Sequence, residues 1–400
     1  MFGIRPRIGC FRRRGILACL LIIIMMSVLQ VRYYSMTGSQ GESHWQNFIW
    51  QPPDVYNERK RSGYEIVHTG NNNEVKHHIA FLKVHKAASS TVQNIFLRYA
   101  MHKDLVVVVP HVNKLFYPNI ISTGKTVTPN NILPPPENKS YEVLCCHVLY
   151  DRTAFEGIMP SDTVYIGIIR EPFGHFVSIL NYFRPREVLD INDTLAVSKY
   201  LQEPLLYTKP NSKSYVNSRM AREFGFPPDL YITHNESGIE LYLDKLEYEF
   251  QLVMIVELFD ESMILMRRLL NWKLRDVLYV KKNVKHNLFE KIKFTAGDVE
   301  RYKKWAVLDY ALYDRFYQRL QNQIQMQGPD FYEELLHFKR VRRDMDFFCN
   351  PMPGVKPSAA YHCPASKWNQ PFIITTEDCH YMNIGETAFI KEIRMKQYGI

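Results

Sequence analysis

Six side chains suited to binding an anion lie within nine residues of the sequence: Lys83, His85, Lys86, Ser89, Ser90 and Thr91. The surrounding stretch FLKVHKAASSTVQNIFLRYA, residues 81–100, has the pattern of an apolar strand end, a polar turn and an amphipathic helix. A turn of this kind binds anions in α/β proteins, because the first-turn N–H groups of the helix lack intrahelical partners and the helix dipole favours negative charge. The turn therefore predicts a phosphate or sulfate site. The simpler interpretation is that the serines cap a helix and the lysines are solvated.

This turn differs from the phosphate loop of nucleotide kinases. That loop has the form G-x-x-x-x-G-K-[ST], whose glycines let the backbone wrap the β- and γ-phosphates. Residues 83–91 contain no glycine. We therefore expect a ligand with one phosphorus group at its 5′ end, and the missing glycines weigh against a phosphoryl-transferring enzyme.

A second strand-turn-helix unit, TVYIGIIREPFGHFVSILNYF, occupies residues 163–183. Its apolar strand ends at Arg170, Pro172 stands where a helix can start, and Ser178 follows within the helix. The arginine fork and the serine hydroxyl can converge on a second phosphate. An arginine after a strand is by itself more often an ion-pairing residue, but the two units together suit the two ends of one doubly phosphorylated nucleotide.

The elements that position these turns alternate between strand and helix patterns. Short apolar runs occupy residues 78–84, 105–109, 142–149, 163–169, 250–256 and 277–280. Nearly continuous apolar runs are typical of strands buried on both faces. Their alternation with helices predicts an α/β fold with a central parallel β-sheet flanked by helices.

Four helices are predicted among and after these strands. Apolar residues recur at helical spacing in 92–99, and the acidic and serine residues 260–262 can cap a helix that continues as MILMRRLL. Asp298 can cap a long helix whose apolar positions run to Phe316. The segment DFYEELLHFKRVRRDM, residues 330–345, predicts the fourth helix.

Both turns resemble motifs of one enzyme family. KVHKAASST resembles the 5′-phosphosulfate loop, and IIREPFGHFVS the 3′-phosphate motif, of Golgi sulfotransferases that use 3′-phosphoadenosine 5′-phosphosulfate. The sequence is similar to the galactose-3-O-sulfotransferase family, which includes galactosylceramide sulfotransferase. The similarity lies in the Lys-x-His-Lys-x-x-Ser-Ser-Thr form of the loop and in the stretches EVLCCHV, FQLVMIVELFDESMILMRRLLNW and DVLYVKKN. The resemblance covers about residues 77–320 and implies a P-loop-like sulfotransferase fold, with a catalytic domain over 77–345.

The resemblance also implies which residues bind the donor. Lys86 would lie on the 5′-phosphate and the bridging oxygen, Lys83 would stabilise the sulfuryl oxygens, and Arg170 and Ser178 would hold the 3′-phosphate. The loop that completes the donor site is Lys86, Ala87, Ala88, Ser89, Ser90 and Thr91. Lys83 could instead be a lysine at a strand end that only reaches towards solvent.

Two histidines are candidate general bases. His85 has the residue type whose unperturbed pKa, near 6.5, suits proton acceptance. His147, within LCCHVLY, is an acceptor contact or base by resemblance, and equally a satisfied core residue. Sulfuryl transfer depends mainly on positioning and electrostatics, so we expect no metal if lysines supply the positive charge.

The sequence departs from the family pattern in two places. The family loop reads Lys-Thr-His-Lys-Thr-Ala-Ser-Ser-Thr, and Val84 and Ala87 replace its two threonines before the serines. The C-terminal extension, 346–400, matches only loosely. We expect sulfate transfer to the 3-hydroxyl of a terminal galactose on a galactosylceramide-type glycolipid or a glycoprotein glycan. A sulfotransferase for another sugar hydroxyl, or an inactive luminal protein with this fold, are the alternatives.

The N-terminal residues predict a membrane anchor that precedes the α/β fold. Residues 1–14 contain five arginines and no acid, and residues 15–31 form an apolar run with no small-residue cleavage site after it. The run is at the short end for a transmembrane helix and longer than a signal-peptide core. We expect an uncleaved anchor of a single-pass type II Golgi membrane protein, with a cytoplasmic tail and a luminal stem over 32–76. A cleaved signal peptide is the alternative.

Other features agree with a luminal domain. Asn138, Asn192 and Asn235 begin Asn-x-Ser/Thr sequons. Five cysteines follow the anchor, so at least one is unpaired or pairs with another chain, and the pairing cannot be read from the sequence. The net charge of +9 includes the five N-terminal arginines, so the rest of the chain is near +4. That charge suits a local anion site and not a nucleic-acid surface. The expected partners are a galactose-terminated acceptor, the Golgi membrane and a second copy in a homodimer.

Overall fold

The computed structural model describes residues 74–111, 118–183, 196–207, 215–281, 294–352, 354 and 358–400. All of these belong to a compact unit spanning Gly63–Ile400. The predicted anchor, almost all of the predicted stem, and Asn192 lie outside the described residues. No helix among the described residues combines the length and the apolar character that a membrane crossing requires.

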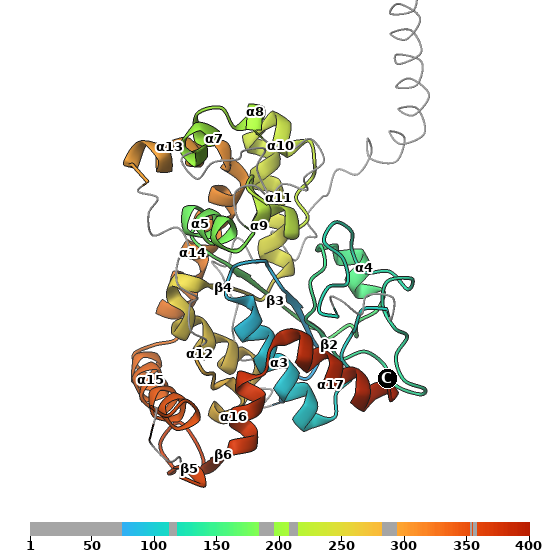
Figure 1. Ribbon diagram of the computed structural model, residues 1–400, viewed down its shortest axis with the longest axis vertical. Helices are drawn as coiled ribbons and strands as arrows, with labels where there is room; N and C mark the ends of the chain where they lie inside the picture. The colour runs from blue at the N-terminus through green and yellow to red at the C-terminus, as the bar shows by residue number, and fades with distance from the viewer. Residues whose placement is uncertain are drawn as a thin grey trace, which may run out of the picture. The chain divides into compact units, whose positions relative to one another are not determined.

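Four parallel strands form the central sheet of the described chain (Figure 1). They are β1 (Ile79–Leu82), β2 (Val143–Leu144), β3 (Val164–Ile169) and β4 (Leu252–Ile255), in the order β2-β1-β3-β4. Ile79 is in register with Val143 on one side and with Val164 on the other. The predicted parallel sheet flanked by helices is confirmed.

The remaining elements surround this sheet. The helices before β4 are α3 (Ser89–Lys103), α4 (Arg152–Glu156), α5 (Pro172–Phe183), α7 (Ala196–Gln202), α8 (Pro204–Tyr207), α9 (Arg219–Glu223), α10 (Leu230–Thr233) and α11 (Glu236–Glu249). After β4 come η2 (Val256–Leu258), α12 (Phe259–Leu270), η3 (Leu274–Val277), α13 (Ala296–Trp305), α14 (Val307–Gln325), α15 (Asp330–Cys349), β5 (Ala360–Cys363), β6 (Phe372–Thr375), α16 (Thr376–Asn383) and α17 (Glu386–Tyr398).

Two of the predicted strands are wrong. The run 105–109 pairs with β2 only around Val107, where Val143 N–H donates to the Val106 carbonyl and Val108 N–H donates to the Val143 carbonyl. It does not continue as a regular strand, and the Val109 carbonyl accepts a hydrogen bond from Leu133 N–H. The run 277–280 begins as the end of η3, and the carbonyl of Leu278 accepts from the Arg98 side chain instead of a strand. Residues 106–109 and 277–280 are buried, and burial alone produces an apolar run whether or not the backbone forms a regular strand.

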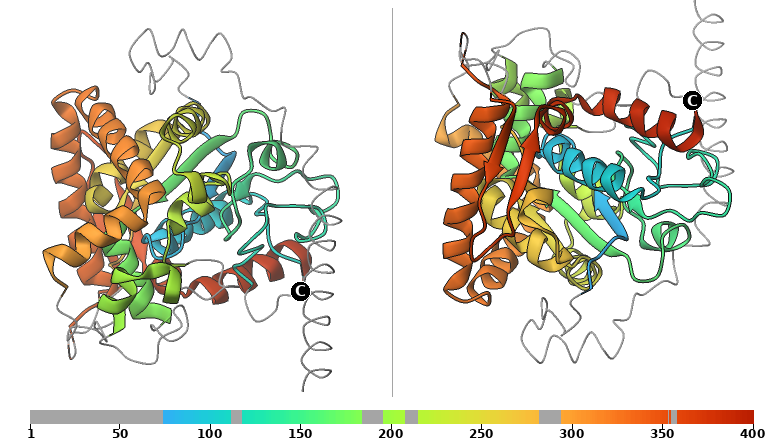
Figure 2. Two further views of the ribbon diagram at one scale, coloured as in Figure 1. Left: turned by 90° about the horizontal axis from the view of Figure 1, so that it is seen from above. Right: turned by 90° about the horizontal axis from the view of Figure 1, so that it is seen from below.

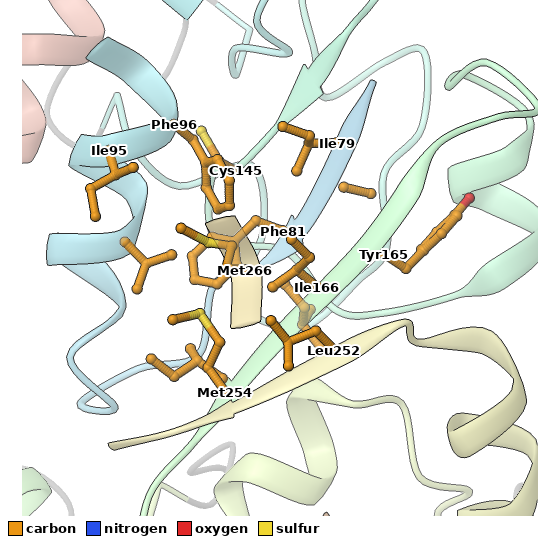
Figure 3. Close-up of a cluster of buried hydrophobic side chains, with 14 of the residues drawn as sticks. Ile79, Phe81, Ile95, Phe96, Cys145, Tyr165, Ile166, Leu252, Met254 and Met266 are labelled. Atoms are coloured by element: carbon orange, nitrogen blue, oxygen red, sulfur yellow. The ribbon is translucent and has the colours of Figure 1, made fainter. Parts of the chain in front are cut away.

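One face of the sheet packs against α3 and α12 (Figure 3). The rings of Phe81 on β1 and Phe96 on α3 lie 5.2 Å apart, with Met254 and Met266 beside them. On the opposite face a Cβ at Gly167 would lie 2.7 Å from the Phe224 ring. Glycine on β3 therefore allows the residue that ends α9 to pack directly on the sheet.

Helix capping differs from the prediction at two helices. The predicted helix from residue 298 to 316 is divided at Ala306 into α13 and α14, and Thr295, not Asp298, is its N-cap. Asp298 is the third helical residue and completes a capping box with Thr295. Helix α12 begins after Leu258 without a side-chain cap, so the prediction that residues 260–262 cap it is wrong.

The predicted helix over 330–345 is confirmed as the main part of α15, and three further structures follow it. The strands β5 and β6 form an antiparallel hairpin, and α16 and α17 pack against α3 (Figure 2). A disulfide between Cys349 and Cys379 joins the end of α15 to α16. Cys145, Cys146 and Cys363 are buried and unpaired within the chain, which agrees with the prediction that at least one cysteine is unpaired or pairs with another chain. The extension 346–400 thus belongs to the same compact unit as the sheet.

Candidate active site

The turn after β1 has an unusual backbone for a segment without glycine. Lys86 and Ala88 both adopt left-handed conformations, with φ of 59° and 53°. Ala88 is the N-cap of α3, and no side chain caps that helix end. Alternating backbone handedness before an uncapped helix directs N–H groups into one concavity, which is a nest for an anion.

The serines of the turn do not act as helix caps. The Ser89 hydroxyl donates to the carbonyl of Val84 and is buried, so it folds the turn back on itself. The Ser90 hydroxyl donates to Glu386, 2.7 Å away. The simpler interpretation that these serines cap α3 is therefore wrong, and the Thr91 N–H at the start of the helix donates instead to the Ala88 carbonyl at 3.1 Å.

Lys83 is buried at the end of β1, with 1% of its surface exposed. Its ammonium donates to His147 Nε2 at 2.9 Å and to Glu386 Oε2 at 2.8 Å, and lies 3.5 Å from Ser90 Oγ. A buried lysine with these fixed partners is not a strand-end lysine that reaches into solvent. Its charge is held at the base of the turn.

His147 is buried directly behind Lys83. Its Nδ1 lies 2.9 Å from the Lys83 carbonyl and must carry the proton there, so Nε2 offers its lone pair to the Lys83 ammonium. Burial, followed by the positive charge of Lys83, holds the pKa of His147 well below its ordinary value. His147 is therefore neutral, and the lone pair that a general base would use is occupied by Lys83.

His85 has a different environment. Its main-chain N–H donates to Glu223 Oε2 at 2.9 Å, and its ring Nδ1 is paired with Glu223 Oε1. Arg219 donates to the same carboxylate at 2.7 Å, and the Nε2 of the buried His175 donates to the His85 carbonyl at 2.7 Å. The ring of His85 is stacked on that of His147, with centroids 3.7 Å apart. With Nδ1 protonated towards Glu223, the lone pair of His85 is on Nε2.

Glu223 is ionised in spite of its burial. Burial raises the pKa of this carboxyl, but the positive charge of Arg219 and the hydrogen bond from the His85 ring together lower it far below its ordinary value. The ligand atoms of His85, His147 and Glu223 also lie within 4.8 Å of one another, a spacing that a cation could use. Lys83 and Arg219 hold positive charge against two of those groups, so this set does not suit a metal ion.

The second predicted unit lies against the first. The Arg170 guanidinium is 3.5 Å from the Lys86 carbonyl, and it folds across the first turn of α5, where a Cβ at Gly174 would lie 3.5 Å from Arg170 Nε. Ser178 lies one turn beyond Gly174 on the same helix face. The Lys86 ammonium lies 4.0 Å from the centre of the Tyr182 ring, near the end of α5. The structure thus brings Lys86, Arg170 and α5 together.

A family model described as Galactose-3-O-sulfotransferase matches residues 13–376 of this chain. The chain belongs to the galactose-3-O-sulfotransferase family. The resemblance predicted from the two phosphate motifs is confirmed, and it extends well beyond them in both directions.

Three curated relatives illustrate the range of the family. Galactose-3-O-sulfotransferase 3 of Mus musculus is 32% identical over 248 residues, which are 60% of this chain and 55% of that protein. Galactosylceramide sulfotransferase of Homo sapiens is 28% identical over 249 residues, 60% of this chain and 56% of that protein. Galactose-3-O-sulfotransferase 2 of Mus musculus is 27% identical over 285 residues, 70% of this chain and 71% of that protein. The chain therefore matches little more than half the length of the first two relatives.

Four side chains of this galactose-3-O-sulfotransferase family member enter the site without having been predicted from its sequence: Arg219, Glu223, His175 and Glu386. His175 stands within the second motif, and its place on α5 could have been a signal. Arg219 and Glu223 are four residues apart, the spacing of a helical ion pair, but such pairs are common on helix surfaces. Glu386 lies in the extension that matches the family pattern only loosely.

The two sequons in the described chain are accessible. Asn138 is exposed in the loop before β2. Asn235 is exposed and caps α11, with its side-chain oxygen accepting from Gly238 N–H at 3.0 Å. That bond uses the amide oxygen, so the amide nitrogen is free for a glycan.

Proposed function

We propose that this protein transfers sulfate from 3′-phosphoadenosine 5′-phosphosulfate to the 3-hydroxyl of a terminal galactose. The observation that carries the proposal is the pair formed by His85 and Glu223 next to the nest of the β1–α3 turn. A base with an orienting carboxylate therefore lies beside an anion site. Family membership and the printed names of the relatives support galactose as the acceptor sugar.

The residues of the turn fit the phosphosulfate end of this donor. The uncapped start of α3 and the left-handed Lys86 and Ala88 form a cradle of N–H groups for one phosphorus group. Lys86 would hold the 5′-phosphate and Lys83 the sulfuryl oxygens. The Ser90 N–H and the Thr91 hydroxyl would complete the cradle at the start of the helix.

The second unit fits the 3′-phosphate end. Arg170 lies over the first turn of α5, and Ser178 is one turn further along that helix. We propose that the guanidinium and the hydroxyl hold the 3′-phosphate, because a fork of N–H donors matches phosphate geometry. The fold is then of the P-loop-like sulfotransferase type, with the nucleotide along the carboxyl ends of β1 and β3.

His85 acts as the general base in the proposed reaction. Its Nε2 accepts the proton of the acceptor hydroxyl while the acceptor oxygen bonds to sulfur and the bond from sulfur to the bridging oxygen breaks. Lys86 and the N–H groups stabilise the negative charge on the departing 5′-phosphate. Glu223 keeps the Nδ1 proton in place and stabilises the imidazolium that forms. The products are a sulfate ester, 3′-phosphoadenosine 5′-phosphate and a proton.

Aromatic side chains beside the base suit the sugar. The exposed Tyr182 lies under the Lys86 ammonium, and the ring of Tyr215 meets that of His85 edge-on at 5.8 Å. Phe183 lies 4.7 Å from Tyr215. We propose that this aromatic strip packs on the galactose ring, whereas Trp272 is buried against Tyr99 and belongs to the core.

The cellular setting is also a proposal and is supported by the sequence. Residues 15–31 anchor a type II protein in the Golgi membrane, the donor and acceptor bind on the luminal side, and glycans are carried at the sequons. The acceptor is a glycolipid of the galactosylceramide type or a glycoprotein glycan, and the chain forms a homodimer.

The test is sulfate transfer by the full chain in detergent, with radiolabelled donor and a panel of acceptors. The panel contains galactosylceramide, lactosylceramide, two lactosamines, a core 1 disaccharide and a sugar without galactose. We expect label on at least one galactoside and none when its 3-hydroxyl is blocked. Label on the sugar without galactose would move the protein to another acceptor class. Donor binding with no transfer to any sugar would indicate an inactive protein that retains the fold.

A further inference from the structure

A carboxylate from the C-terminal helix α17 reaches the base of the turn between β1 and α3, residues 83–91, which we call the donor turn. Glu386, in the first turn of α17, accepts hydrogen bonds from three side chains on three separate segments. Its Oε2 accepts from Lys83 at 2.8 Å and from Ser90 at 2.7 Å, and its Oε1 accepts from Asn119 at 2.7 Å. No other carboxylate in the described chain is hydrogen-bonded to Lys83 or to Ser90.

Glu386 is negatively charged in this arrangement. Burial raises the pKa of its carboxyl, but the charge of Lys83 and the hydrogen bonds from Lys83 and Ser90 together lower it below its ordinary value. Its side chain is 32% exposed, whereas that of Lys83 is 1% exposed. Lys83 therefore depends on Glu386 for its charge compensation, since its other close partner, His147, is neutral.

The contacts of Lys83 also define where its remaining proton points. An ammonium has three donors, and two are used at normal distances, by His147 and by Glu386. The third is directed at Ser90, whose oxygen lies 3.5 Å away, too far for a strong hydrogen bond. That donor faces the start of α3, which is where the proposed phosphosulfate group would lie.

We propose that Glu386 is a positioning residue that holds Lys83 so that its third proton faces the sulfuryl group. This inference rests on the proposed function and assigns to the C-terminal helix a part in the reaction. Glu386 acts through Lys83 and does not touch the reacting atoms. The family's loop residues are thus completed by a side chain 303 positions away from Lys83.

The test compares Glu386→Gln with Glu377→Gln as a matched control. Both residues are glutamates in the first turn of a C-terminal helix, so both variants lose the same favourable interaction with a helix dipole. Glu377 is exposed, and no hydrogen bond to the donor turn involves it. We expect Glu386→Gln to lower kcat at least about tenfold, the scale of one misplaced charged donor. Glu377→Gln should leave kcat unchanged.

The affinity for 3′-phosphoadenosine 5′-phosphate separates positioning from folding. Removing a negative charge beside an anion site should leave the Kd of this nucleotide unchanged or lower it. Loss of nucleotide binding together with kcat in Glu386→Gln, or an unchanged kcat, would overturn the proposal. Calorimetric titration gives the Kd, and thermal unfolding shows whether the variant is folded.

A double-mutant cycle with Lys83→Met tests whether Glu386 acts through Lys83. In the Lys83→Met background, Glu386→Gln should lower kcat by less than about threefold, because the positioned group is already absent. Additive losses would contradict the inference. If the wild-type chain transfers no sulfate at all, the proposed function fails by itself. The free energies of unfolding of the same variants, measured in urea, still test the contact between Lys83 and Glu386. Additive changes in these free energies would contradict the pairing of the two residues.

Discussion

Glu223 holds His85 through two groups at once. One carboxylate oxygen accepts the main-chain N–H of His85 at 2.9 Å, and the other pairs with the ring nitrogen Nδ1. The carboxylate is itself fixed by Arg219, one helical turn earlier on α9, at 2.7 Å. The position of the imidazole, its tautomer and its orientation are therefore set by one residue.

Removing the imidazole should stop the reaction and leave donor binding intact. In His85→Ala we expect no measurable turnover, because the acceptor hydroxyl has no proton acceptor, and a nucleotide Kd within about threefold of wild type. Calorimetry and the transfer assay measure the two quantities. Turnover equal to wild type would exclude His85 as the base.

Glu223→Gln should separate orientation from binding. An amide can accept the main-chain N–H but does not stabilise an imidazolium, so we expect kcat to fall by about 100-fold or more with nucleotide affinity kept. Glu249→Gln is the matched control, since Glu249 is a buried carboxylate that accepts from Tyr150 at 2.9 Å. A similar loss of kcat in both variants would indicate a general effect of replacing a buried carboxyl group by an amide.

Arg170→Ala should act mainly on the donor. A charge-assisted contact to phosphate is worth about 1.5 to 3 kcal/mol, so the nucleotide Kd should rise by about 10- to 100-fold. Arg152→Ala, which breaks an ion pair with Glu156 at 2.7 Å, should leave the Kd unchanged. The sharper form of the test is 5′-AMP, which lacks the 3′-phosphate and should bind wild type and Arg170→Ala equally. A preference for wild type that persists with 5′-AMP would place Arg170 elsewhere.

The buried Asp309 should make stability depend on pH. Burial, opposed by N–H donors from Ala221 and Met220, raises the pKa of Asp309 from 3.8 to about 7. The folded state then binds the proton more tightly than the unfolded state. The contribution of this proton to the free energy of unfolding is therefore complete below about pH 4 and is lost as the pH rises to about 7. Asp309→Asn should remove the part of the decrease in the free energy of unfolding that Asp309 causes between about pH 4 and pH 7. Urea unfolding from pH 4 to 8 measures it, and parallel curves for the two proteins would exclude the effect.

The disulfide between Cys349 and Cys379 should stabilise the fold. Closing a loop of 30 residues is worth about 3 to 4 kcal/mol in the chain-entropy account. We expect the double variant Cys349→Ser with Cys379→Ser to unfold at lower temperature and lower urea concentration, and Cys363→Ser to match wild type. Equal stability of all three proteins would mean that packing of α15 and α16 suffices.

The residues that could be predicted are those next to a strand in the sequence. Four predicted residues directly follow buried strands: Lys83, His85, Lys86 and Arg170. The carboxyl ends of parallel strands lie at the same edge of the sheet, so residues that follow different strands lie near one another. Glu223 and Glu386 could not be predicted in this way. They lie 138 residues from His85 and 303 residues from Lys83, and a contact over such a distance leaves no periodic signal in either segment.

The two wrong strands have a related cause. The valines of 105–109 and the segment 278–280 are buried, and a sequence pattern reports burial more directly than hydrogen bonding. Whether a buried backbone pairs with a strand depends on what lies beside it. At Leu278 that neighbour is the Arg98 side chain of α3, which satisfies the carbonyl and makes a strand unnecessary.

The left-handed backbone of Lys86 and Ala88 has a consequence for the energetics of the proposed donor binding. Each such residue other than glycine is strained by about 1 kcal/mol, and the remaining fold must hold it in place. Ala88→Gly would relieve that strain, but it would also let the turn adopt more backbone conformations before the nucleotide binds. Alanine allows the turn fewer backbone conformations than glycine does. The conformational entropy of the turn is therefore lost when the chain folds, and not when the nucleotide binds. A nucleotide that meets a turn already in shape associates with a smaller entropic penalty.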